Sequence, residues 1–368
     1  MANSSGTHND WVVKKLSDVL VLHYGKALKK EDRRDGPFPV FGSSGVVGAH
    51  DVSLAKGPGV IVGRKGNVGS VFWSDRDFFV IDTAYYVTSS LPLRFLYYLL
   101  PTLNFINGDA AVPGLSRNQA YSLDVRIPPL PIQQRIAGIL SAYDDQIENS
   151  QRRIKILEEM ARSLYREWFV NFRYPGHESV PLVSSPLGEI PQGWEGRRLF
   201  DLTKVGYGKN LPTKKLSDDG AYPVYGAAKI IGRYTEYTRE NRTIICGCRG
   251  SVGEMQITQR QCYVTNNSFT FDPLHQYDFF WLFHTLKERG LRDVVGGAAQ
   301  PQITLEGISS VELVTPPSLL RNQFQEVVTA IFEQIWVLDD QVENLRRTRD
   351  LLLPRLLSGQ IDVEAMAA

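Results

Sequence analysis

The chain has 368 residues, of which 43% are hydrophobic and 22% charged, with a formal net charge of +1. A chain of this length is too long to form one hydrophobic core of ordinary size, so we expect two or more globular domains. No apolar run is long enough to span a membrane, the first ten residues lack the apolar core of a signal peptide, and three cysteines argue against a disulfide framework. We therefore expect a cytoplasmic protein, whose near-neutral charge permits nucleic-acid binding without demanding it.

Residues 1–130 are typical of a mixed α/β domain. Short apolar runs bounded by turns predict strands at 59–63, 70–73 and 78–81. An aromatic-rich amphipathic stretch predicts a short helix at 91–100.

A long helix is predicted over residues 131–173. It follows a proline block at 128–131, which cannot continue a strand and suits the start of a helix. At 1.5 Å per residue it would reach about 50–60 Å, so its apolar side needs a partner. Its apolar residues follow at alternating steps of three and four, the seam of a coiled coil: Ile154, Leu157, Ala161, Leu164 and Trp168.

The second half of the chain has the same organisation. Residues 174–193, dense in Pro, Gly and Ser, predict an exposed linker. Residues 194–317 predict a second mixed α/β domain, with a strand at 242–246 and a helix at 277–287. Residues 318–368 predict a second long helix, whose seam is interrupted only by Arg349: Phe324, Val328, Ile331, Ile335, Leu338, Val342, Leu345, Leu352 and Leu356.

Short motifs recur between the two halves at nearly constant spacing. The Tyr-Gly-Lys triplet at 24–26 returns at 207–209. The glycine loop Lys-Gly-Asn-Val-Gly at 65–69 returns as Arg-Gly-Ser-Val-Gly at 249–253. The chain is therefore an internal repeat of one unit: domain, proline hinge, long helix.

The spacing of the repeat changes inside the second helix. The double proline at 128–129 returns at 316–317, whereas the acidic block at 144–149 returns at 339–344, which is later than the proline spacing predicts. The extra seven residues are one heptad, which keeps an apolar seam on the same face. We predict two α/β domains joined by two long antiparallel coiled-coil helices, related by a pseudo-twofold axis that places one domain at each end of the helix pair.

The glycine loops are the strongest candidates for a binding site. Arg64, Lys65 and Asn67 follow a predicted strand, as do Arg249 and Ser251. Successive backbone N–H groups beside a cation could form a nest for a DNA phosphate. A plain hairpin turn with a surface cation is the alternative.

Further candidates surround these loops. Lysines near the Tyr-Gly-Lys triplets could track phosphates, or could merely be solvated: Lys26, Lys29, Lys209, Lys214 and Lys215. Small segments able to approach another surface occur at Ser43 and Ser44, before Lys229, and at 107–111 and 296–300. Side chains able to read base edges differ between the halves: Asn118 and Gln119 in one, Gln300 and Gln302 in the other.

No catalytic constellation is found. Phosphate-binding Walker loops, nucleophile elbows, zinc-protease motifs and the Asn-Pro-Pro-aromatic tetrad of adenine methyltransferases are absent, and the six histidines do not recur between the halves. Cys246 and Cys248 are better explained as buried thiols than as metal ligands, because no second close pair accompanies them. We expect a non-catalytic chain without a metal or cofactor of its own.

Taken together, six segments resemble the DNA-specificity (S) subunit of Type I restriction–modification enzymes. The resemblance covers nearly the whole chain, and it is specific because the segments occur together. They are residues 38–45, 62–69, 81–86 and 127–134, with 168–172 after the first helix and 353–361 after the second.

The resemblance implies two target-recognition domains, 1–130 and 194–317, each reading half of a split DNA site. It implies that the helices set the unread spacer and dock two methyltransferase subunits, with two motor–nuclease subunits added for restriction. S-adenosylmethionine, ATP and magnesium would then belong to those N6-adenine methyltransferase and nuclease partners. Candidate partner-binding residues lie near the helix ends: Trp168, Phe169, Phe172, Leu356 and Leu357.

Other interpretations remain open at this stage. The chain could be a stand-alone DNA-binding regulator, or the specificity subunit of a related Type IIB-like system with a bipartite site. A coiled-coil scaffold without nucleic acid is a third alternative, although it leaves the matched glycine and lysine loops unexplained.

Overall fold

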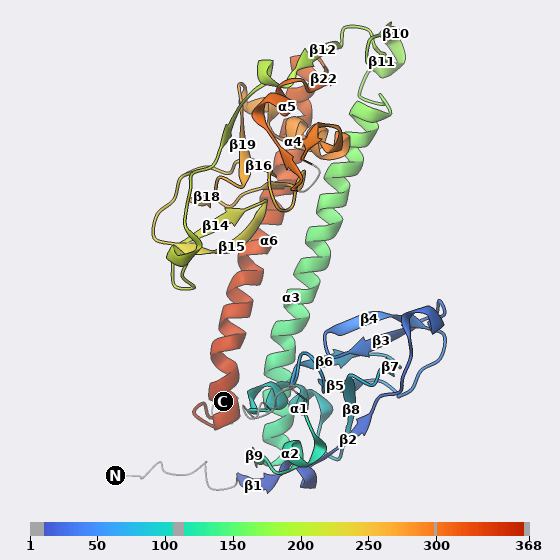
Figure 1. Cartoon of the computed structure of the whole chain (residues 1–368), viewed down its shortest axis with the longest axis vertical. Helices are drawn as coiled ribbons and strands as arrows, with labels where there is room; N and C mark the ends of the chain where they lie inside the picture. Colours follow the sequence, from blue (N-terminus) through green and yellow to red (C-terminus); the bar gives the residue numbers. More distant parts are fainter. Residues whose placement is uncertain (1–10, 106–113, 298–299, 364–368) are drawn as a thin grey trace. The chain divides into compact units, whose positions relative to one another are not determined.

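The computed structural model describes residues 11–105, 114–297 and 300–363 (Figure 1). The chain divides into two compact units. The first comprises the residues up to Gln151 and those from Asp339 onward, and the second comprises Arg152–Leu338. Because the division cuts both long helices, each unit holds one α/β domain and parts of both helices.

Two sheets form the domain of the first unit. One is four-stranded and antiparallel in the order β2-β8-β5-β6, and the other has the order β4-β3-β7 with β3 and β7 parallel. All five residues of β5 are buried, as expected for an apolar run in the middle of a sheet. The elements are β1 (Val12–Lys15), β2 (Leu20–Tyr24), β3 (Phe38–Gly42), β4 (Gly45–His50), β5 (Gly59–Gly63), β6 (Val71–Ser74), β7 (Phe79–Val80), β8 (Ala84–Ser89), α1 (Leu93–Leu99), α2 (Arg117–Tyr121) and β9 (Asp124–Ile127).

The second unit repeats this topology. Its sheets have the orders β13-β19-β16-β17 and β15-β14-β18, and β12 pairs with β22 as β1 pairs with β9. A register shift falls at Val40/Phe41 in one copy and at Val224/Tyr225 in the other, which are matched positions of the repeat. The elements are β12 (Glu195–Arg198), β13 (Thr203–Tyr207), β14 (Tyr222–Gly226), β15 (Lys229–Tyr234), β16 (Ile244–Gly247), β17 (Met255–Ile257), β18 (Tyr263–Val264), β19 (Ser268–Pro273), α4 (Phe279–Arg289), β20 (Val295–Gly296), β21 (Gln302–Ile303), α5 (Leu305–Ser309) and β22 (Glu312–Thr315). The predicted internal repeat is confirmed.

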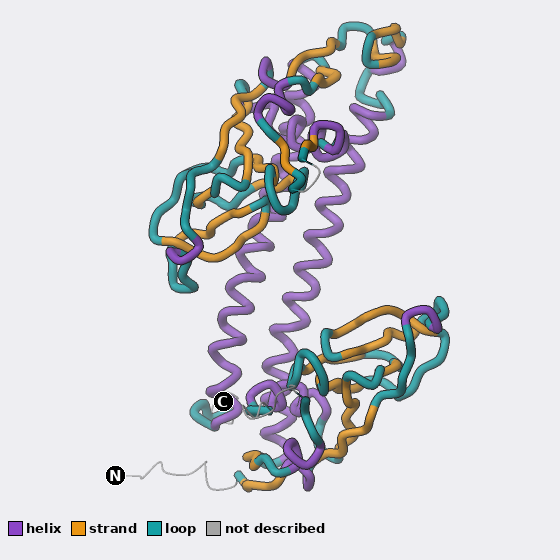
Figure 2. Tube along the Cα trace, viewed as in Figure 1, coloured by secondary structure: helices purple, strands orange, loops and turns teal. Residues whose placement is uncertain are grey.

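The two long helices are α3 (Leu130–Tyr165) and α6 (Ser318–Ser358), drawn as the longest helical stretches in Figure 2. A π-helical turn, Arg166–Val170, follows α3. Helix α6 stops short of the expected 368, because Gly359 adopts a left-handed conformation with φ 77°, which ends a helix. None of the helices in the described ranges is long and apolar enough to cross a membrane.

The helices run antiparallel, since in each unit the beginning of one lies against the end of the other. In the first unit, Ile136 and Leu140 of α3 share a buried cluster with Leu356 and Leu357 of α6. Arg349, which interrupts the predicted seam, donates to the carboxylate of Asp144 in α3 at 2.6 Å. The polar residue in the seam is therefore one half of an ion pair between the helices.

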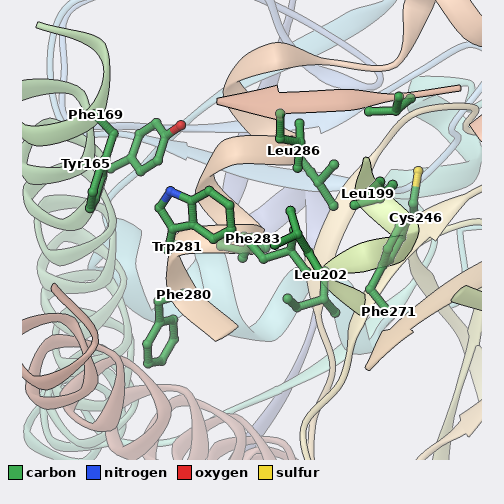
Figure 3. Packing of buried hydrophobic residues seen from close by; sticks show 14 of the residues in the cluster. Tyr165, Phe169, Leu199, Leu202, Cys246, Phe271, Phe280, Trp281, Phe283 and Leu286 are labelled. Atoms are coloured by element: carbon green, nitrogen blue, oxygen red, sulfur yellow. The ribbon is translucent and has the colours of Figure 1, made fainter. Parts of the chain in front are cut away.

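In the second unit the end of α3 and the beginning of α6 enclose an aromatic core. Tyr165, the last residue of α3, and Phe169, in the π-helical turn that follows it, share a buried cluster with Phe324 of α6. Figure 3 shows Tyr165 and Phe169 with Phe280 and Trp281 of α4 in this cluster. Helix α4, predicted from its aromatic amphipathic pattern, therefore packs the domain of this unit against the two long helices.

The linker between the copies contains structure that its composition did not predict. Residues Leu182–Ser185 (β10) and Gly188–Pro191 (β11) form an antiparallel hairpin. Gly188, the first residue of β11, directly follows the turn and has φ 102°, a conformation that favours glycine.

Candidate nucleic-acid interface

In the first unit, five loops converge where the sheets end. They are residues 24–26, 43–44, 64–69, 82–83 and 114–118, here called the first loop cluster. Thr83 lies at its centre: its carbonyl accepts the N–H groups of Arg64 (2.8 Å) and Lys65 (3.1 Å), and its hydroxyl accepts the N–H of Ser43 (3.3 Å). Segments far apart in sequence are thereby fixed to one residue.

Two further contacts complete this cluster. The N–H of Lys26 donates to the carbonyl of Val80, and the N–H of Leu115 donates to the carbonyl of Arg64, at 2.9 and 2.8 Å. Gly25 cannot be replaced without a shift, because a Cβ there would lie 2.1 Å from the carbonyl oxygen of Ile81. The glycine of the Tyr-Gly-Lys triplet therefore permits the close approach of two backbone segments.

The predicted polar residues of the first cluster are mostly on its surface. Lys26, Ser44, Lys65, Asn67 and Asn118 are exposed, and Ser43 and Arg64 are half-buried. Lys65 lies 3.8 Å from the carboxylate of Asp82. Because both side chains are about half exposed, this pair contributes little to stability and leaves the lysine available. Gln119 has another role, since it forms the capping box of α2 with Ser116.

The second unit builds a matching second loop cluster from residues 207–209, 227–228, 249–253, 266–267 and 300–302. The carbonyl of Asn267 accepts the N–H groups of Cys248 (2.9 Å) and Arg249 (3.4 Å), as that of Thr83 does in the first unit. The N–H of Lys209 donates to the carbonyl of Val264, matching Lys26 and Val80. The backbone of both clusters is therefore held by the same bonds.

The side chains of the second cluster differ from those of the first. Arg249 donates from Nε to the Oε1 of Gln302 at 3.3 Å, so these two predicted residues support each other. Gln300, Arg249, Lys209 and Lys229 are exposed. Ser251 is half-buried. The predicted segment 107–111, and residues 298–299 of its counterpart, lie outside the described residues.

The phosphate nest predicted for the glycine loops is limited to a few amides by hydrogen bonds within the chain. In the first loop, the N–H groups of Arg64, Lys65, Val68 and Gly69 already donate to carbonyls of this chain. Within the described residues, this leaves the N–H groups of Gly66 and Asn67 as the free donors of that turn. The loop is a closed turn with an exposed cation, and a phosphate nest there stays a prediction that would depend on these two amides.

Three predicted lysines lie outside the loops that form the clusters. Lys29 precedes a short helical turn at Lys30–Asp32, and Lys214 and Lys215 end another at Thr213–Lys215. The segments that follow bond to β4 and β15, through Arg33 to the carbonyl of Val47 and through the N–H of Ser217 to the carbonyl of Arg233. Among the described residues, no hydrogen bond or ion pair joins these lysines to the loop clusters.

The five candidate partner-binding residues contribute to the cores of this chain. Phe169, Leu356 and Leu357 are buried, and Trp168 and Phe172 pack against the same core as Phe169. Their apolar character is explained by contacts within the chain. Docking through them stays a prediction.

The cysteines are free and buried. Burial raises the pKa of the Cys246 thiol to about 12 and also raises that of Cys248, so both stay protonated at neutral pH. In the ranges that the structure covers, no group of three or more His, Cys, Asp or Glu side chains is placed to hold a metal ion.

Sequence reasoning missed two residues of the first cluster. Thr83 organises the backbone, but a lone threonine carries no local signal of that role. Arg117 stacks its guanidinium on the ring of Tyr24, with the Cζ atom 4.0 Å from the ring centroid. These two residues are far apart in the sequence, so only the fold brings them together.

Comparisons with known proteins agree with this architecture. The family model described as "Type I restriction modification DNA specificity domain" matches residues 8–159 and 191–343. The two matches coincide with the two halves of the repeat and together cover most of the chain.

Individual relatives are similar over much of their length. The specificity subunit of the Type I restriction enzyme MjaIX of Methanocaldococcus jannaschii is 26% identical over 304 residues, covering 74% of this chain and 70% of the relative. The HindI specificity subunit of Haemophilus influenzae is 25% identical over 396 residues, covering 81% and 85%.

A solved structure shows the same fold. The crystal structure of the Type I restriction–modification system S subunit from M. genitalium aligns with a TM-score of 0.64 and 18% identity, covering 96% of this chain and 98% of that one. With two matched recognition domains, an internal repeat and an antiparallel helix pair in place, the chain belongs to the family of Type I restriction–modification DNA specificity subunits.

Proposed function

We propose that this chain reads the two halves of a split DNA site, one half with each loop cluster. The observation that carries the proposal is the pair of clusters, which share their backbone bonds but not their side chains. In the first cluster, Lys65 forms an antiparallel β-bridge with Gly114 through the backbone. In the second cluster, Arg249 forms the same kind of bridge with Gln302. A shared frame suits contact with the DNA backbone, which is the same everywhere, and different side chains suit two different base sequences.

In this proposal the exposed cations make phosphate contacts and the uncharged polar residues face base edges. Lys26, Lys65, Lys209, Lys229 and Arg249 supply the first kind. Candidates for the second kind are Ser43, Ser44, Asn67, Asn118, Ser251, Gln300 and Gln302. Lys29, Lys214 and Lys215, which lie outside the loops of the clusters, would contact flanking DNA.

The chemistry in this proposal belongs to partner subunits. The names of the relatives, specificity subunits of Type I restriction enzymes, support a division of labour in which this chain docks two methyltransferase and two motor–nuclease subunits. S-adenosylmethionine, ATP and magnesium would act in those partners, and this chain would be non-catalytic. Because its net charge is +1, the isolated chain should bind DNA weakly.

The test is to co-express the chain with its methyltransferase and to sequence the methylated adenines of the host genome. We expect one motif with two specified halves and an unspecified spacer. Removing one heptad from each long helix should shorten the spacer and leave both halves unchanged. A continuous motif, or nanomolar specific binding by the purified chain alone, would contradict the proposal.

A further inference from the structure

In the first loop cluster, Arg117 stacks on an aromatic ring, but its side chain makes no hydrogen bond with the other described residues of the cluster. Its guanidinium stacks on Tyr24, a residue that is 47% exposed. The backbone of Arg117 is fixed as well, because it is the first residue of α2 and follows the Ser116 capping box. The ring of Tyr24 and the capped start of α2 therefore both restrict where the guanidinium can lie.

The hydrogen-bond donors of Arg117 remain unused. Its Nε is buried without a partner, and among the described residues no carboxylate or carbonyl accepts from its guanidinium. Arg64 lies over the same ring at 4.8 Å, but it donates to the carbonyl of Asp82. A buried donor without an acceptor is costly, and a second guanidinium near the same ring adds repulsion. An acceptor bound to the Nη groups of Arg117 would offset the repulsion between the two guanidinium groups.

We propose that Arg117 reads a guanine in the half-site bound by the first loop cluster. One N–H from each of its two Nη atoms would donate to O6 and N7 of the base in the major groove. This is the commonest specific contact that arginine makes with DNA. Stacking on Tyr24 supplies the fixed plane that such a bidentate bond needs. This inference rests on the proposed function and names a base-reading residue for it.

The second loop cluster has no counterpart of this device within its described residues. At the spacing of the proline hinges, Arg117 is matched by Leu305, which packs against the core. At the spacing of the glycine loops, Arg64 is matched by Cys248, which is buried. The ring of Tyr207, the match of Tyr24, lies against Phe269 as Tyr24 lies against Tyr85, but among the described residues no guanidinium lies over it. A guanine contact of this kind is therefore confined to the first half-site.

The test uses the complete complex with its methyltransferase and compares Arg117→Gln and Arg117→Lys with the natural chain. Methylated sites are sequenced, and binding to DNA duplexes that vary one base at a time is measured at several salt concentrations. We expect both variants to lose discrimination by about 5- to 150-fold at one guanine of one half-site. The other half-site should not change. Lysine should not rescue, because it cannot present a planar pair of donors.

Arg126→Gln is the matched control. Arg126 is exposed on β9 of the same unit, with its guanidinium 5.7 Å from the ring of Trp11, and its replacement should leave the motif unchanged. Tyr24→Phe should keep the motif because it keeps the ring.

Three outcomes would overturn the inference. Weaker binding to every sequence, with the salt dependence reduced by about one ion, would make Arg117 a phosphate contact. An unchanged motif would give it no role in recognition. A natural complex without a split motif would overturn the proposed function, and this inference with it.

Discussion

Asp144 and Phe332 lie equally far along the chain from their proline hinges, although the acidic block pairs Asp144 with Asp339 by sequence, and the two positions build different junctions. In the first unit, the hydroxyl of Tyr98 and the guanidinium of Arg349 donate to the carboxylate of Asp144 at 2.5 and 2.6 Å. In the second unit, the ring of Phe332 stacks on that of Phe280 with centroids 4.5 Å apart. One junction is polar and the other is aromatic.

The same contrast appears on the domain side of each junction. Tyr98 of α1 and His284 of α4, which lie in the short helices of the two copies, are both buried. The ring of His284 stacks on Tyr165 and lies 6.0 Å from Phe332. The repeat therefore preserves where the short helix meets the long one, but not the chemistry of the contact. The two units should consequently respond to different perturbations.

The largest effect is expected from Phe332→Ala. Removing a buried aromatic side chain leaves a cavity, and the second unit should lose about 3–5 kcal/mol of stability. Hydrogen exchange of peptides from 277–289 and 318–338 should speed up while peptides of the first unit do not change. Val337→Ala, on an exposed site of the same helix, is the control. Equal loss of protection in both units would mean that the junctions are not independent.

Acid should weaken the second unit through His284. Burial, with Lys287 and Arg162 nearby, lowers the pKa of His284 from 6.5 to about 3. The unfolded chain binds a proton below about pH 6.5 while the folded chain does not, so stability is complete above that pH and declines toward pH 3. The slope should approach about 1.4 kcal/mol per pH unit.

His284→Leu should remove this pH dependence from the second unit. Denaturation followed between pH 7 and pH 5 measures it. Tyr98 provides no such dependence in the first unit, because burial and the Asp144 carboxylate raise its pKa. An unchanged slope in the variant would exclude His284 as the source.

The smallest effect on stability is expected at the polar junction. It should appear as an interaction energy between Asp144 and Arg349. Asp144 and Arg349 are only 21% and 27% exposed, so a double-mutant cycle of Asp144→Ala and Arg349→Met should give about 2 kcal/mol. Arg347→Met, at an exposed position on another side of the same helix, should not couple to Asp144. Coupling near zero would make Arg349 a tolerated polar residue rather than a link between the helices.

Local and periodic features could be predicted from the sequence. The seam of apolar residues predicted both long helices, and the repeated motifs predicted the second copy of the domain. Strand β5 and helix α4 could be predicted for the same reason, because the apolar run of one and the aromatic pattern of the other involve only neighbouring residues.

Features that depend on distant residues were not legible. Arg349 pairs with Asp144 and Arg117 stacks on Tyr24, and in both cases the partner lies far away in the sequence. The carbonyl of Thr83 accepts two of the amides of the first glycine loop, and although Thr83 lies in the segment 81–86, nothing in that segment indicates this role. Composition predicted a linker at 174–193, but it could not show that one glycine allows a hairpin to form there.

The most direct test of two independent reading clusters is the methylation motif of two matched variants of the complete complex. One carries Asn67→Ala with Asn118→Ala, and the other carries Ser251→Ala with Gln300→Ala. We expect the first variant to relax one half of the motif and the second to relax the other half only. Changes in both halves from either variant, or in neither half from both, would contradict the account.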